Sequence, residues 1–123
     1  MNQDDLKKRT KRFALDVLAL IDLLPNTIKG RAVGNQLVKS GTSVGANYRA
    51  VCRSRSKAEF IARLGVVIEE ADESCFWFEL IIEGEILEER KVRDLLNEGD
   101  QLVAIMTSSR KTAGSSCNRQ SEI

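Results

Sequence analysis

Residues 56–83, SKAEFIARLGVVIEEADESCFWFELIIE, contain the pattern that decides the fold. Apolar residues recur there at alternating spacings of three and four, which is typical of a helix packed in a bundle. The predicted seam consists of Ile61, Leu64, Ile68, Ala71, Cys75, Phe78 and Ile82. Ser56 to Glu59 has the pattern of a capping box, and Gly84 is a typical helix C-cap. We therefore predict a long amphipathic helix over residues 56–83.

Three other segments show the same helical period. The first runs over about residues 5–24 and ends before Pro25, which cannot continue a helix. The second covers about residues 31–54. It contains Gly41 and Gly45, each costing about 1 kcal/mol relative to alanine. We expect their compensation to be the close approach of another helix.

The last helix is expected over about residues 88–108. Four such helices joined by short loops predict an all-α fold, an antiparallel up-and-down four-helix bundle over residues 1–108. Residues 109–123 are small and polar and lack periodicity, so we expect a disordered C-terminal tail there.

The composition excludes several classes of function. The chain of 123 residues has no histidine, which removes imidazole bases, the usual catalytic triads and histidine zinc sites. Cys52, Cys75 and Cys117 are scattered without a CxxC motif, so neither a disulfide framework nor a thiolate metal site is expected. We also expect no cofactor. The odd cysteine count and the missing signal peptide and membrane span predict a cytoplasmic protein.

The net charge of +1 hides a strong asymmetry between the two halves of the chain. Residues 1–58 contain 12 basic and 4 acidic residues, whereas residues 59–123 contain 7 basic and 14 acidic residues. Such asymmetry marks either an interaction surface or two halves that attract each other within the fold or between subunits.

Most of the basic residues fall on the first helix, on one face of the second helix and at the end of that helix. Clustered cations bind phosphates through charge, largely without reading sequence. The alternative is a solvated face or a contact with the acidic half of another subunit. The candidate nucleic-acid-binding residues are Lys7, Lys8, Arg9, Lys11, Arg12, Arg31, Lys39, Arg49, Arg53, Arg55 and Lys57.

An uncharged polar sector lies beside the apolar face of the second helix. Buried polar groups need partners, and the third helix offers two carboxylates three residues apart. We expect a buried, hydrogen-bonded seam in preference to a ligand-binding site, made of Gln36, Ser40, Ser43, Asn47, Glu70 and Glu73. The two carboxylates lie on one helix without a second acid or a Glu-x-x-His motif, so we expect no enzymatic activity.

The third helix has a second, partial apolar face, which a monomeric bundle does not require. Aromatic anchors are enriched at protein interfaces. We therefore favour an oligomer interface at Val66, Trp77 and Leu80 over a wide core contact.

Residues 36–51, QLVKSGTSVGANYRAV, and residues 56–81 carry a resemblance to a known family. The combined pattern resembles the four-helix bundle proteins related to the 23S rRNA intervening-sequence proteins. It is carried by Gln36, Ser40, Gly41, Ser43, Gly45, Ala46, Asn47, Ser56, Lys57, Phe60, Glu70, Ala71, Glu73 and Trp77. One departure is that Ala50-Val51 stands where the family often has an acid followed by alanine.

The resemblance implies a small cytoplasmic bundle that assembles as a ring-like homopentamer without enzymatic activity. It also implies RNA or DNA as a ligand and a reverse transcriptase as a protein partner, because the family includes the accessory protein of diversity-generating retroelements. The sequence thus favours a non-enzymatic oligomeric adaptor for nucleic acid. The alternatives are a purely structural homo-oligomeric scaffold and, more distantly, a small-molecule binder.

Overall fold

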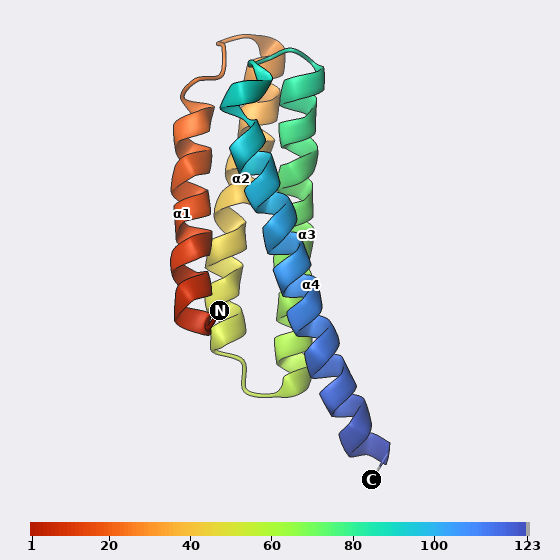
Figure 1. The fold of residues 1–123 in the computed structure, drawn as a ribbon. Helices are drawn as coiled ribbons and strands as arrows, with labels where there is room; N and C mark the ends of the chain where they lie inside the picture. Colours follow the sequence, from red (N-terminus) through yellow and green to blue (C-terminus); the bar gives the residue numbers. More distant parts are fainter. Residues whose placement is uncertain (123) are drawn as a thin grey trace.

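The computed structural model describes the backbone of residues 1–122 and the side chains of residues 1–115. In this part of the chain four α-helices follow one another, with a 3-10 helix before the last. They are α1 (Gln3–Ile21), α2 (Ile28–Cys52), α3 (Lys57–Glu83), η1 (Glu89–Lys91) and α4 (Arg93–Glu122). Consecutive helices run antiparallel, and α4 projects beyond the end of the bundle (Figure 1). The predicted four-helix bundle is confirmed.

Side-chain caps set the N-termini of the first three helices. Asn2 and Asp5 form a reciprocal capping box, so α1 begins at Gln3 and not at about residue 5. Thr27 accepts a hydrogen bond from the Gly30 amide, which starts α2 at Ile28, earlier than predicted. Ser56 accepts one from the Glu59 amide at 3.1 Å, as the sequence predicts for α3.

The bounds of the last helix differ from the prediction at both ends. Gly84 is the C-cap of α3, as expected, and η1 then precedes α4, which starts at Arg93. The helix does not end at residue 108 but runs to Glu122, and residues 109–122 contain no proline that would interrupt it. Residues 109–122 thus have a helical backbone, and disorder of the C-terminal tail stays a prediction. The side chain of Cys117 lies outside the described residues.

The core is formed by side chains from all four helices. Phe13 and Phe78 meet edge to face with ring centroids 6.1 Å apart. On α3 the buried face is turned slightly from the predicted seam: Val67 and Ile81 are fully buried, whereas Ile61, Ile68 and Ile82 are half-buried. The third helix contacts both α2 and α4, so its buried arc is wider than a single seam.

Two glycines of α2 let α1 lie directly against it. A Cβ atom at Gly41 would lie 2.8 Å from both γ-carbons of Val17, and one at Gly45 would lie 3.2 Å from the carbonyl oxygen of Thr10. The expected close approach is therefore confirmed, and its partner is α1. By contrast, α1 makes only light contact with α4.

We predict that Gly41→Val lowers the free energy of unfolding by about 2–3 kcal/mol, because the added methyl groups overlap Val17 in a packed interior. Thermal or urea unfolding measures the change. The control is Gly65→Ala, whose Cβ would meet only the Arg110 guanidinium at an ordinary 3.5 Å. It should leave stability unchanged or raise it by up to about 1 kcal/mol. Equal effects of the two variants would contradict the packing account.

Candidate nucleic-acid interface

A basic cleft lies where the first part of α1 runs beside the last part of α2. It has a volume of about 370 Å³. Lys7 and Lys11 come from α1, and Arg49 and Arg53 come from α2. The remaining lining residues are small or uncharged: Ala14, Thr42, Gly45 and Ala46. We call these eight residues the basic cleft.

The cations of the basic cleft are available to a ligand. All four are exposed. Lys7 has a loose, exposed ion pair with Asp4 at 4.0 Å, whereas the other three have no ion pair among the described residues. No acidic residue lines the cleft. Lys11, Arg49 and Arg53 therefore keep their charges unpaired within the described residues, and Lys7 has only the loose pair with Asp4.

The basic cleft exists because of the close approach at Gly45. This residue belongs to the cleft lining, and its missing side chain brings the α2 backbone within contact of Thr10 on α1. The hydroxyl of Thr10 is buried and donates to the carbonyl of Leu6 at 2.8 Å, so the contact leaves no unpaired polar group there. Cations from two helices thereby border one cleft.

The other predicted basic residues are distributed differently. Arg9 must be removed from the binding set, because Glu98 holds it through two bonds of 2.7 Å and Gln101 adds a third of 2.8 Å. Arg12 is paired with Asp16 on α1. Arg31 donates to Asn26 at the opposite end of α2.

Lys8 and Lys39 are exposed outside the basic cleft, and Arg55 lies 3.9 Å from Glu59. Lys57, at the start of α3, lines a separate shallow cleft with Ser108 of α4. The structure thus brings together only part of the predicted set.

The polarity of the helices places further cations at the same end of the molecule. α2 descends to the end of the bundle where α1 begins, and α4 descends to it as well (Figure 1). Arg110 and Lys111 of α4 therefore join that end. The sequence analysis did not include them among the candidate binding residues, since a helical wheel does not say which helix ends meet.

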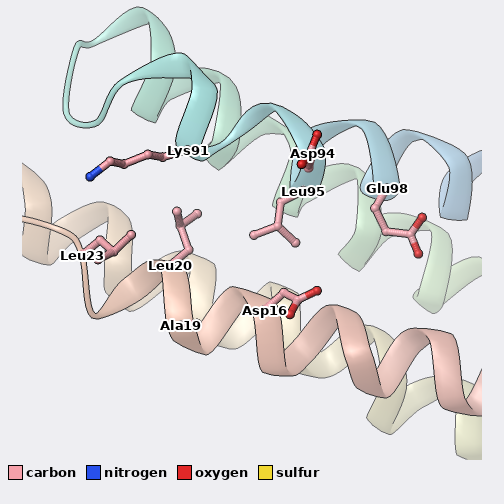
Figure 2. Close-up of a pocket in the computed structure, with 8 residues that line it drawn as sticks. All are labelled: Asp16, Ala19, Leu20, Leu23, Lys91, Asp94, Leu95 and Glu98. Atoms are coloured by element: carbon pink, nitrogen blue, oxygen red, sulfur yellow. The ribbon is translucent and has the colours of Figure 1, made fainter.

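A second groove, between α1 and α4, has the opposite character. Figure 2 shows Leu20 and Leu95 facing each other across it, with Asp94 and Glu98 on the α4 side and Asp16 on the α1 side. Its volume is about 310 Å³. Three carboxylates and a single cation, Lys91, line it, so it is less suited to a polyanion than the basic cleft.

The predicted polar seam is only partly present. Ser40 is buried and its hydroxyl meets that of Ser74 at 3.0 Å, while Asn47 donates to the Ser43 carbonyl within α2. Gln36 and Glu73 are exposed, which corrects their assignment to a buried seam. The actual partner, Ser74, was missed because sequence reasoning looked for the longer carboxylates.

Glu70 lies half-buried beside this contact, and its pKa is raised above the ordinary value. The main cause is desolvation, followed by repulsion from Glu73 and Glu69. Its carboxylate has no ion pair within the described residues.

The residues predicted for the oligomer interface lie on the outward side of α3. Val66 and Leu80 are 42% and 37% exposed, whereas Trp77 is half-buried and donates to Glu73 at 3.4 Å. Phe76, which the prediction missed, is 49% exposed and stacks edge-on against Trp77. It was missed because it falls between the two predicted faces of the helix.

Residues 1–115, whose side chains are described, contain neither a metal centre nor a reactive thiol. No group of three or more ligating side chains occurs among the described residues. Cys52 and Cys75 are free thiols, and burial raises the pKa of Cys75 to about 12, so it stays protonated at neutral pH. None of the described helices is long and apolar enough to cross a membrane.

The comparisons with known proteins agree with the fold. Residues 3–108 match the family model described as 23S rRNA-intervening sequence protein. A crystal structure of a protein of unknown function from the S23 ribosomal protein family of Bacteroides thetaiotaomicron superposes with a TM-score of 0.82. It is 30% identical, and the match covers 90% of this chain and 99% of that one. No curated protein is detectably similar.

We predict that Glu70→Gln stabilises the fold at neutral pH. A raised pKa means that the native state disfavours the charged carboxylate, so ionisation destabilises the fold above the native pKa. The gain should shrink as the pH falls through that pKa and vanish below the unfolded-state pKa. Thermal unfolding from pH 3.5 to pH 8 measures it, with exposed Glu83→Gln as the control. A gain that grows toward low pH would contradict this assignment.

Proposed function

The chain belongs to the family of 23S rRNA-intervening sequence proteins, and on this premise we propose that it is a non-enzymatic, cytoplasmic adaptor that binds nucleic acid as a homo-oligomer. The observation that carries the proposal is the basic cleft, where four exposed cations from two helices line one cavity without an acid. RNA is the first candidate ligand, because the family's description refers to an rRNA insertion.

The chemistry of the cleft suits a phosphodiester backbone. Lysine and arginine attract phosphates through charge and release the counterions that surround them, which makes such binding strongly salt-dependent. The uncharged residues between the cations offer no base-stacking platform, and the cleft contains no aromatic side chain. We therefore expect recognition of backbone and shape with little sequence preference.

Self-association would strengthen weak binding at each cleft. A homopentamer, the state that the family resemblance implies, would present five clefts to one polyanion, and linked sites raise the effective concentration. The exposed apolar residues of α3, Val66 and Leu80 among them, support an interface. A protein bound to the same nucleic acid, such as a reverse transcriptase, would be a further partner of the assembly.

The absence of an enzymatic role is also a proposal. The chain has no histidine, and the thiol of Cys75 is buried and protonated. Glu70 and Glu73 lie on one helix and repel each other. This arrangement lacks the opposed acid and base that hydrolytic chemistry needs.

We predict that Arg49→Ala/Arg53→Ala weakens binding to a structured RNA by about a hundredfold or more at low salt, given roughly 1.5–3 kcal/mol for each hydrogen bond to a charged group. The slope of log affinity against log salt should fall by about one for each phosphate that the variant no longer neutralises. Fluorescence anisotropy at several salt concentrations measures both quantities.

The matched control is Arg31→Ala/Lys39→Ala, which removes two cations of the same helix that do not line the cleft. It should leave most of the affinity and the slope in place. Equal reductions in both variants would contradict the cleft assignment. Absence of RNA binding by the unmodified protein at low salt would favour the purely structural scaffold.

A further inference from the structure

Two helices carry rows of exposed apolar residues on the outside of the bundle. Neither the packing of the core nor the basic cleft accounts for the exposure of these residues. On α1, Leu15 and Leu18 are 47% and 43% exposed. On α3, Phe76 and Leu80 continue a stripe that starts at Val66. Exposed apolar residues in such rows mark protein contacts more often than scattered ones do.

Both stripes have the spacing of a coiled-coil seam. On α1 the sequence Lys8, Lys11, Leu15, Leu18 advances by three, four and three residues. On α3 the sequence Val66, Glu69, Glu73, Phe76, Leu80 advances by three, four, three and four. Alternation of this kind keeps residues on one helix face and suits packing against a partner helix. We call them the α1 seam and the α3 seam.

The two seams carry opposite charge. Lys8 and Lys11 are exposed, and neither has an ion pair among the described residues. Glu69 and Glu73 are likewise exposed and have no ion pair in that part of the chain. Complementary potentials of this kind select partners and fix register.

The two seams also match in the order of their residues and in their position along the bundle axis. In each seam the charged pair precedes the apolar pair, and α1 and α3 run in the same direction through the bundle (Figure 1). The Phe13 and Phe78 rings touch across the core, so the two segments occupy similar heights. Two copies placed side by side therefore bring lysines opposite glutamates and leucines opposite apolar residues.

The seams lie on helices that are not neighbours within one chain. The helices α1 and α3 are both packed against α2 and are not paired with each other. A single chain therefore cannot join its own seams, and the contact is head to tail. Repeated head-to-tail contacts form a closed ring or an open filament, not an isologous dimer.

We propose that the α1 seam of one copy packs in parallel against the α3 seam of the next copy. Lys8 and Lys11 face Glu69 and Glu73, and Leu15 and Leu18 face Phe76 and Leu80. The inference rests on the proposed self-association and specifies the two surfaces that join. It assigns Lys11, at the edge of the basic cleft, to assembly and leaves Lys7, Arg49 and Arg53 of that cleft to a polyanion.

The test uses two variants of the full chain that each block one seam. Leu15→Glu/Leu18→Glu adds acids to the α1 seam and keeps every cation of the basic cleft. Phe76→Glu/Leu80→Glu adds acids to the α3 seam. Each variant alone should have the 13.7 kDa mass of one chain in light scattering. Mixed together, they should form a complex of one copy of each, because one intact seam of each type remains.

Leu23→Glu is the matched control, since Leu23 is 52% exposed but lies outside both seams. It should retain the mass of the unmodified oligomer. Seam variants that also retain that mass, or monomeric variants whose mixture stays monomeric with native helical circular dichroism, would overturn the seam pairing. A monomeric unmodified protein would instead show that the proposed self-association itself is wrong.

Discussion

At Gly41 and Gly45 the missing side chains of α2 let α1 lie directly on its surface, with Val17 and the Thr10 backbone filling the space. The first helix, α1, packs closely against α2 and makes only light contact with α4. Two features of the surface follow. The basic cleft forms along the close contact, and the acidic groove of Figure 2 opens on the looser side.

Antiparallel connection explains why charge collects at one end of the molecule. The first turns of α1 and the last turns of α2 and α4 meet there, so Lys7, Arg53 and Arg110 come from distant parts of the chain yet share one end. At the other end of the molecule, acidic and basic residues are mixed: Arg90 pairs with Glu88, and Arg93 pairs with Glu89. The excess of basic residues in the first half of the chain is thus gathered mainly at one end of the bundle.

The all-α fold was predictable because apolar residues repeat at helical spacing over residues 56–83. The capping pattern at Ser56 located the start of that helix. The partners of individual side chains were less predictable. Arg9 pairs with Glu98, 89 residues away, and no local pattern foretells that contact. Gln36 shares a wheel sector with Ser40, yet Gln36 is exposed, whereas Ser40 is buried and bonded to Ser74 of α3.

In the proposed function, RNA lies in the cleft between α1 and α2. Chemical labelling of lysines, followed by mass spectrometry with and without a structured RNA, tests this placement directly on the unmodified protein. Lys7 should lose reactivity when RNA binds, whereas Lys29 and Lys91, which do not line the cleft, should keep theirs. Unchanged reactivity of Lys7 under saturating RNA, or stronger protection of Lys29 and Lys91, would contradict the placement.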